Sequence, residues 1–145
     1  MRYVERSEEE DVIQGIVIPG LHNMGYRVAR ERVLGAGVVA DIIAEKANET
    51  LIIEIKTGNH LRSNALYQAR SLKNTISSYG PRMEQYGRGN VQVILGTTAR
   101  VSAEDRERFK MGHIGVISIG RTPEEFQQNL IAVLQRDDDA LNPGF

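Results

Sequence analysis

Residues 38–56 read VVADIIAEKANETLIIEIK, two apolar runs joined by a short polar segment. The branched side chains of both runs favour β-strands, which we predict over Val38–Glu45 and Thr50–Thr57. The polar residues at 46–49 predict a tight turn, so the two strands should pair as an antiparallel hairpin. The second run is apolar on both faces, which is typical of a central strand covered on both sides of a sheet.

Three charged residues stand out in these apolar strands. Side chains alternate across a strand, so Glu54 and Lys56 share one face near the end of the second run. Asp41 is the single carboxylate in the apolar part of the first run. Because unpaired charges are costly in covered strands, these three residues are the first candidates for a functional site.

The hairpin register decides how the three charges meet. A two-residue loop at Ala47-Asn48 would place Asp41 opposite Glu54, whereas a loop at Asn48-Glu49 would place it opposite Lys56. Both registers put all three side chains on one face, and a three-residue loop would send Asp41 to the other face. Two neighbouring carboxylates repel unless a cation lies between them, and Mg²⁺ or Mn²⁺ suits carboxylate oxygens. The alternative is a purely structural ion pair of Lys56 with one carboxylate, which leaves the second carboxylate unexplained.

The spacing of apolar residues and the turn residues divide the rest of the chain. An N-terminal helix is expected over Ser7–Met24, with Pro19 kinking it or ending it early and Gly25 as its stop. Further strands are predicted over Tyr26–Leu34, Val91–Thr97 and Ile114–Ile119, and further helices over Leu61–Tyr79, Ser102–Lys110 and Thr122–Arg136. The order αβββαβαβα predicts an α/β fold, with a mixed central sheet flanked by helices on both faces.

Length and composition limit the class of protein. The 145 residues suit one compact domain, expected over residues 1–136, followed by an acidic and flexible tail at 137–145. The chain has no cysteine, which excludes disulfides, thiolate metal sites and cysteine nucleophiles. Without a signal-peptide core or a run approaching the roughly 20 apolar residues of a membrane span, we expect a cytoplasmic protein with no membrane partner.

The net charge of −1 conceals an uneven distribution along the chain. Residues 56–110 hold ten Lys and Arg against four Asp and Glu, whereas residues 1–55 hold six against ten. A basic middle segment predicts one positive face that could bind a phosphate backbone. The alternative is that many of these residues are ordinary solvated charges on helix surfaces. The candidate phosphate contacts are Arg27, Arg30, Arg32, Arg62, Arg70 and Lys73, with Arg82 and Arg88 as further candidates.

With Asp41 on one strand and Glu54-Ile55-Lys56 on the next, after an N-terminal helix, the chain resembles the PD-(D/E)XK nuclease superfamily. The resemblance implies the restriction-endonuclease-like fold, with its αβββαβ core, and covers residues 7–120 in element order. Ala40 stands where the family often has proline. Among small members, the layout is most similar to archaeal-type Holliday-junction resolvases, which also end the third strand with E-x-K.

The resemblance implies a role for each residue of the motif. Asp41 and Glu54 would bind Mg²⁺, with Mn²⁺ as a substitute, and the backbone carbonyl of Ile55 would be a further ligand. The metal would polarise the phosphate and acidify a bound water. Lys56 would position or deprotonate that water, or stabilise charge on the phosphorane oxygens. A homodimer is expected from the resemblance, because a small domain with one site needs a partner to cut two strands.

Two further residues complete the predicted site. Members of the family often add a carboxylate from the first helix, for which Glu9 and Glu10 are the candidates. We prefer Glu9 because Glu10 is also the expected capping-box partner of Ser7, although both would favour a helix N-terminus in any case. Gln68 falls on the apolar stripe of its helix, and several branches of the family place a glutamine there to orient the site. The alternative is that Gln68 only borders the stripe.

These observations predict a Mg²⁺-dependent DNA endonuclease that hydrolyses phosphodiester bonds. Selectivity for junctions or branched DNA, in repair or recombination, is what the likeness to the resolvases suggests. One alternative is a catalytically silent nucleic-acid-binding or assembly subunit on the same fold, against which the intact Asp41, Glu54 and Lys56 count. Another is an α/β domain in which these residues form only a structural ion pair. No phosphate-cradling glycine loop or dinucleotide fingerprint supports a nucleotide enzyme.

Overall fold

The protein was analysed as a computed structural model, which describes residues 8–35, 38–47, 49–59, 61, 65–79 and 90–141. Five strands form one sheet in the order β1-β2-β3-β4-β5. The first three pair antiparallel, and β3, β4 and β5 are parallel, so the sheet is mixed as predicted. The strands are β1 (Arg27–Gly35), β2 (Val38–Lys46), β3 (Glu49–Lys56), β4 (Asn90–Thr97) and β5 (Gly115–Ser118).

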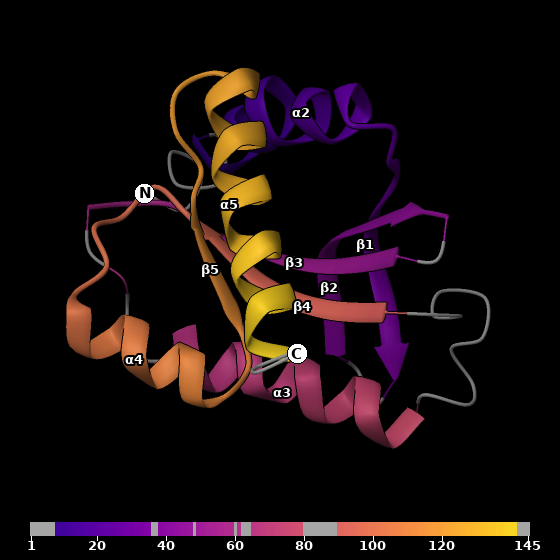
Figure 1. The fold of residues 1–145 in the computed structure, drawn as a ribbon. Coiled ribbons are helices and arrows are strands. Elements are labelled where there is room, and N and C mark those ends of the chain that lie inside the picture. The colour runs from indigo at the N-terminus through magenta and orange to yellow at the C-terminus, as the bar shows by residue number, and fades with distance from the viewer. Residues whose placement is uncertain are drawn as a thin grey trace.

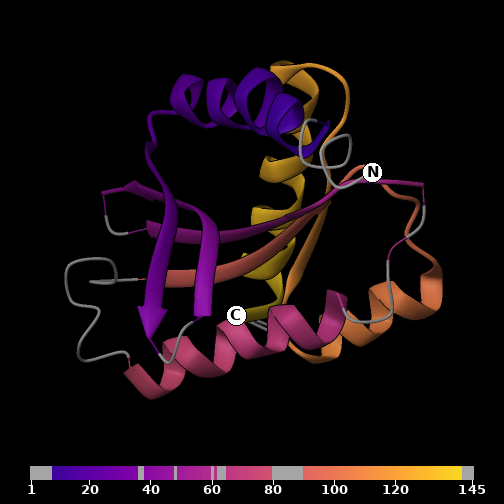
Figure 2. The same cartoon turned by 180° about the vertical axis from the view of Figure 1, so that it is seen from behind.

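Helices cover both faces of this sheet (Figures 1 and 2). One face carries the N-terminal helix, which runs through residues 8–12, η1 (Ile13–Val17) and α2 (Ile18–Asn23), together with α5 (Pro123–Leu141). The other face carries α3 (Ala65–Tyr79) and α4 (Ala103–Met111). The predicted α/β fold and its αβββαβ order are therefore confirmed. No helix among the described residues is long and apolar enough to cross a membrane.

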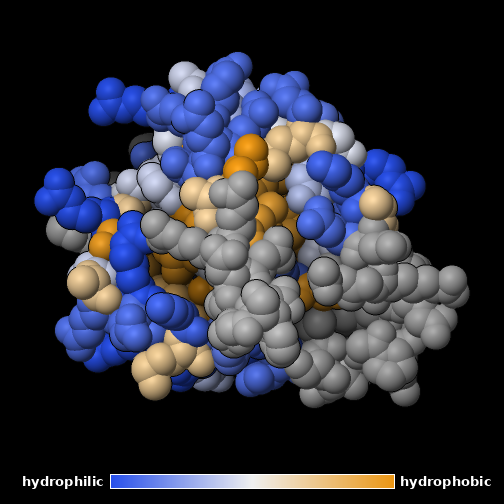
Figure 3. Space-filling view, in the orientation of Figure 1, coloured by the Kyte–Doolittle hydropathy of each residue, from blue (hydrophilic) through white to orange (hydrophobic). Residues whose placement is uncertain are grey.

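The core consists of two apolar clusters, one on each face of the sheet. In β3, Ile53 belongs to the cluster beneath η1, α2 and α5, whereas its neighbour Ile52 belongs to the cluster beneath α3 and α4. This alternation confirms that β3 is covered on both faces. On the molecular surface in the orientation of Figure 1, hydrophilic residues surround a hydrophobic centre (Figure 3). Burying an isoleucine contributes about 1.5–3 kcal/mol, so charges within such a strand need a reason of their own.

The N-terminal helix accommodates Pro19 through a π-helical turn. The Ile18 amide bonds to the Ile13 carbonyl, five residues earlier, at the point where the helix passes from η1 to α2. Proline has no amide hydrogen and crowds the carbonyl four residues before it, and a π turn adjusts the helix at such a position. Of the two predicted alternatives, a kink at Pro19 or an early end, the early end is excluded because the helix continues to Asn23. Gly25, with φ of +91°, follows it at the predicted stop.

The later helices can be compared with their predicted ends and capping residues. The Ser102 hydroxyl accepts a hydrogen bond from the Asp105 amide at 3.1 Å, and the Thr122 hydroxyl accepts one from Glu125 at 3.1 Å. The end of α4 at Met111 lies one residue from the prediction. The predicted first residue of α3, Leu61, is not helical, and residues 62–64 lie outside the described residues. Helix α5 continues to Leu141, beyond the predicted end at Arg136. Residues 137–141 thus belong to a helix, and residues 142–145 of the expected tail lie outside the described residues.

Candidate active site

The pairing of β2 with β3 settles which residue faces Asp41. Paired residues run from Lys46 with Glu49 to Ile42 with Ile53, which makes Ala47-Asn48 the hairpin loop. Continued by one position, this register would bring Asp41 opposite Glu54, and the charge of Asp41 acts on the pKa of Glu54. Of the registers considered, the two-residue loop at Ala47-Asn48 is therefore the correct one.

Asp41 is fixed in place by the backbone of β3. Backbone pairing between β2 and β3 ends at Ile42 and Ile53, and the Ile55 amide donates a hydrogen bond to Asp41 Oδ2 at 2.9 Å instead. The side chain thus replaces a backbone acceptor at the end of the hairpin. This contact holds the Asp41 carboxylate against the strand that carries Glu54 and Lys56.

Glu54 and Lys56 form an ion pair beside Asp41. The distance from Lys56 Nζ to Glu54 Oε1 is 3.4 Å. The side chain of Lys56 is 30% exposed and that of Glu54 is 12% exposed. Burial raises the pKa of Glu54 to about 7, and the negative charge of Asp41 acts in the same direction, against the opposing effect of Lys56. Burial also raises the pKa of Asp41, although the Ile55 amide and Lys56 act to lower it. One ammonium is therefore shared by two carboxylates that repel each other.

The first helix brings Glu9, rather than Glu10, toward this group. Burial is the largest of the effects that raise the pKa of Glu9, and the negative charge of Asp41 is the second. The positive charge of Lys56 acts to lower it. These effects place Glu9 within electrostatic reach of the Asp41 and Lys56 side chains. The preference for Glu9 agrees with this arrangement, and its role as a metal ligand stays a prediction.

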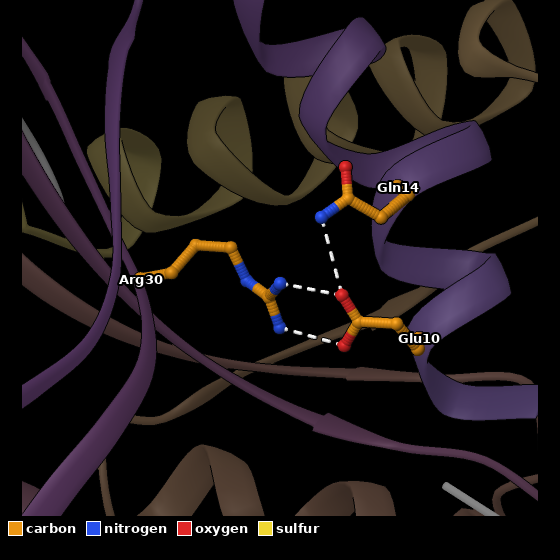
Figure 4. A network of polar contacts seen from close by, with 3 residues as sticks. All are labelled: Glu10, Gln14 and Arg30. Atoms are coloured by element: carbon orange, nitrogen blue, oxygen red, sulfur yellow. Dashed lines mark hydrogen bonds and ion pairs between the residues drawn. The ribbon is translucent and has the colours of Figure 1, made fainter. Parts of the chain in front are cut away.

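Glu10 is held by a different partner, as Figure 4 shows. Its two carboxylate oxygens accept hydrogen bonds from Arg30 Nη1 at 2.5 Å and Nη2 at 2.9 Å, and Gln14 Nε2 donates a third at 3.1 Å. The hydrogen bonds from Arg30 lower the pKa of Glu10. We call Glu10, Gln14 and Arg30 the helix clamp, because they join the N-terminal helix to β1.

The donor set at Asp41 and Glu54 suits a hard divalent cation. Among the described residues, no group of three or more His, Asp or Glu side chains is arranged to hold a metal ion. A metal at this position would have two carboxylates and would take its other ligands from the backbone, water or substrate. Mg²⁺ commonly binds proteins in this way, through one or two carboxylates together with substrate phosphate. The pKa of Glu54 is raised first by burial and then by the charge of Asp41, and a cation between the two carboxylates would offset both effects.

Gln68 carries a buried oxygen without a partner. Its Oε1 atom is shielded from solvent, and no described residue donates a hydrogen bond to it. Leaving such an acceptor unpaired costs about 1–3 kcal/mol, which favours a donor from outside the described residues. The expectation that an amide at this position of α3 needs a partner is consistent with this observation.

Two of the predicted phosphate contacts have partners inside the protein. Arg30 belongs to the helix clamp, and its side chain is 28% exposed. Lys73 Nζ donates to the Gly112 carbonyl at 2.6 Å and to the His113 carbonyl at 3.4 Å, at the C-terminal end of α4. A cation at the end of a helix stabilises it, so Lys73 joins α3 to α4. The structure therefore gives both residues a structural role that their sequence positions did not indicate.

The structure describes only part of the other predicted phosphate contacts, and their contact with DNA stays a prediction. Arg27 is 86% exposed and lies 3.7 Å from Glu45, and Arg70 is exposed near Gly112. The side chain of Arg32 and the whole of Arg62 lie outside the described residues, as do Arg82 and Arg88.

Glu31 is a neighbour of Asp41 that the sequence did not single out. It lies on β1 between Arg30 and Arg32, which pair with Ile42 and Ala40 on either side of Asp41. Its negative charge helps to raise the pKa of Asp41, and its φ of +52° is unusual for a residue with a side chain. No sequence signal marks it, because an exposed glutamate on an edge strand is ordinary.

Comparisons with known proteins support the fold. No protein-family model and no curated protein matches the chain. A crystal structure of AF1548, a protein of unknown function, is similar with a TM-score of 0.55 and 19% identity, over 77% of this chain and 61% of that one. VC1899 from Vibrio cholerae gives a TM-score of 0.51 and 19% identity, over 86% of this chain and 32% of that one.

A third similar structure is Can2 from Sulfobacillus thermosulfidooxidans, in complex with cyclic tetra-adenylate. Its TM-score is 0.56 with 13% identity, over 88% of this chain and 36% of Can2. The chain thus spans less than two thirds of each of these proteins. At such low identities the likeness concerns the fold alone, and it agrees with the α/β arrangement described above.

Proposed function

We propose that this chain is a metal-dependent nuclease of the PD-(D/E)XK superfamily that hydrolyses phosphodiester bonds in DNA. The observation that carries the proposal is the convergence of Asp41 and Glu54 from neighbouring strands, with Lys56 beside them. This arrangement supports a site in which two acids and one amine act on a common ligand.

A purely structural ion pair explains this arrangement less well. Lys56 needs only one carboxylate to be neutralised, and Glu54 already lies 3.4 Å from it. Asp41 adds a second negative charge, which helps to raise the pKa of Glu54 to about 7. Because the two carboxylates repel each other, the second one makes the site less favourable without a cation.

Asp41, Glu54 and the Ile55 carbonyl are the groups that would hold the metal, with Glu9 as a further carboxylate beside them. When bound, Mg²⁺ or Mn²⁺ would polarise the scissile phosphate and lower the pKa of a coordinated water. The residues present fit such an ion because hard cations prefer oxygen donors of this kind.

The protein's own groups would orient the reaction. The Ile55 amide fixes the Asp41 carboxylate, so its position is set before substrate arrives. Lys56 is 30% exposed, and from this position its ammonium would orient the attacking water or stabilise negative charge on the phosphate oxygens. The Gln68 oxygen would accept a hydrogen bond from water or substrate.

The resemblance to resolvases supports branched DNA as the substrate and a homodimer as the active form. One site cuts one strand, so two copies would be needed to cut both strands of a duplex or junction. Arginine-rich contacts to the phosphate backbone would make binding strongly dependent on salt.

The test is a cleavage panel of single-stranded, duplex, flap and four-way DNA with Mg²⁺. We expect nicking or cutting of at least one substrate, loss of that activity with EDTA, and loss in Asp41→Ala. If the purified protein cleaves neither DNA nor RNA with Mg²⁺ or Mn²⁺, a nucleic-acid-binding or assembly subunit on the same fold replaces the nuclease. Gel-shift binding and sedimentation on the same samples would identify that outcome and report the oligomeric state.

A further inference from the structure

A cleft opens at the carboxyl ends of β4 and β5, next to the candidate active site. Its volume is about 300 Å³, and its walls include Thr98 and Arg100 after β4, Ser118 at the end of β5 and Arg106 from α4. We call these four residues the arginine cleft. The carboxyl ends of parallel strands are where open α/β sheets usually bind ligands.

The arginine cleft is bonded directly to the end of β3. Lys56 pairs with Thr97 across the parallel ladder, and its carbonyl accepts a hydrogen bond from the Thr98 amide at 3.2 Å. The Thr98 hydroxyl in turn accepts one from the Gly58 amide at 3.1 Å. Neighbouring strands lie about 4.8 Å apart, so the cleft lies about 5–10 Å from the strand end that carries Lys56.

The charges of the cleft suit an anion. Arg100 and Arg106 are both exposed, and neither takes part in an ion pair among the described residues. Arg108 on the same helix differs, because it lies 2.7 Å from Glu104 and 3.8 Å from Asp105. Guanidinium groups bind phosphate oxygens through two parallel hydrogen bonds, and hydroxyl groups add further donors.

We propose that the arginine cleft binds a backbone phosphate of the DNA strand that is cut, with Arg100 and Arg106 as the binding residues. The cleft volume lies at the low end of the roughly 300–1,000 Å³ of small-ligand sites, which suits one sugar-phosphate unit rather than a duplex. Successive phosphates of one strand advance about 3.4 Å along the axis of B-DNA and lie farther apart than this in space, so the bound phosphate lies within about three linkages of the scissile one. This inference rests on the proposed nuclease function, and it assigns the phosphate contact to residues other than Arg30 and Lys73, which have partners within the protein.

The first test compares DNA binding by the wild type, by Arg100→Ala/Arg106→Ala and by Arg108→Ala, all in EDTA so that no strand is cut. We expect the double variant to bind an oligonucleotide about tenfold more weakly, with a salt slope smaller by about 1 because one phosphate contact is lost. Arg108→Ala removes one positive charge from α4, the helix that also carries Arg106, and this variant should bind as the wild type does. The affinity of Arg100→Lys/Arg106→Lys for the oligonucleotide should lie between those of the wild type and the alanine double variant. Equal binding by all four proteins would overturn the proposal.

The second test locates the phosphate with oligonucleotides that carry one neutral methylphosphonate linkage at successive positions. One such linkage, within about three positions of the cut, should weaken binding by the wild type and leave the double variant unaffected. At each position, the loss of affinity caused by the methylphosphonate is compared between the wild type and the double variant. If the two proteins lose affinity by the same factor at every position, or if the sensitive linkage lies more than about three positions from the cut, the cleft does not hold this phosphate.

The two proposals fail in different ways. A wild type that binds DNA through the cleft but does not cut it with Mg²⁺ would refute the nuclease and leave the cleft supported. A wild type that cuts DNA, with an unchanged KM in the double variant, would refute the cleft alone. Absence of DNA binding by the wild type would refute both.

Discussion

Two neighbouring glutamates on the first helix have opposite electrostatic environments. Glu10 belongs to the helix clamp, where two hydrogen bonds from Arg30 lower its pKa. The pKa of Glu9 is raised, first by burial and then by Asp41. The clamp pairs one carboxylate with one guanidinium. The acidic cluster, which we define as Glu9, Asp41, Glu54 and Lys56, sets three carboxylates against one ammonium.

This contrast separates charges that hold the fold from charges that are available for chemistry. A paired and half-exposed ion pair such as the clamp has little left to gain from a ligand. Carboxylates that repel each other in a shielded place are stabilised by any cation that enters. The acidic cluster, and not the clamp, is therefore the part of the molecule that we expect to respond to metal and pH.

The largest expected effect is on the rate of DNA cleavage, when one carboxylate of the acidic cluster or of the helix clamp is replaced by an amide of the same shape. Asp41→Asn or Glu54→Gln should lower the rate of DNA cleavage by roughly 10³-fold, because several kcal/mol of metal-dependent stabilisation are lost. Glu10→Gln should change the rate by less than about tenfold. Single-turnover assays at saturating Mg²⁺ measure both. Comparable losses in all three variants would remove the distinction between the groups.

A smaller effect is expected on the pH dependence of stability without metal. The pKa of Glu54 is raised from 4.5 to about 7 in the folded protein, so the folded state binds more protons than the unfolded state between these values. The stabilisation is present below about pH 4.5 and is lost as pH rises through 7, by up to about 3 kcal/mol. Denaturant unfolding in EDTA should show this loss in the wild type and much less of it in Glu54→Gln.

Metal provides the control for this pH effect. At pH 8, Mg²⁺ should raise the free energy of unfolding of the wild type and have little effect on Glu54→Gln. Parallel pH profiles for the two proteins in EDTA would show that Glu54 ionises normally, and the contrast with Glu10 would then be lost.

The sheet could be predicted because its information is local. The alternating apolar residues of β3 enter two separate clusters, and the hydroxyls of Ser102 and Thr122 cap the helices that follow them. The sequence does not specify the hairpin register, because the turn carries no Asn-Gly or similar signal. Ala47 adopts a φ of +50°, which its side chain does not favour and which only the surrounding strands impose.

The candidate site could be predicted only in part, because its charges are paired over long distances in the sequence. Asp41, Glu54 and Lys56 were evident as charges in apolar strands, and their meeting followed from the hairpin. The pairing of Arg30 with Glu10, and of Lys73 with Gly112, joins residues 20 and 39 positions apart. Such contacts depend on how helices dock onto the sheet, which periodicity does not specify, so the sequence does not indicate these internal partners of Arg30 and Lys73.

The smallest expected effect is the coupling within the helix clamp itself. The side chains of Arg30 and Glu10 are 28% and 47% exposed, so water screens their attraction despite the short hydrogen bonds. A double-mutant cycle of Glu10→Gln and Arg30→Gln should give a coupling of at most about 1 kcal/mol in the free energy of unfolding, reduced further in 1 M NaCl. A coupling well above this value, or loss of Mg²⁺-dependent cleavage in Glu10→Gln, would mean that the clamp also sets the position of Glu9. Glu10 and Glu9 would then act as one unit, and the division between fold-holding and ligand-binding charges would have to be drawn beyond the first helix.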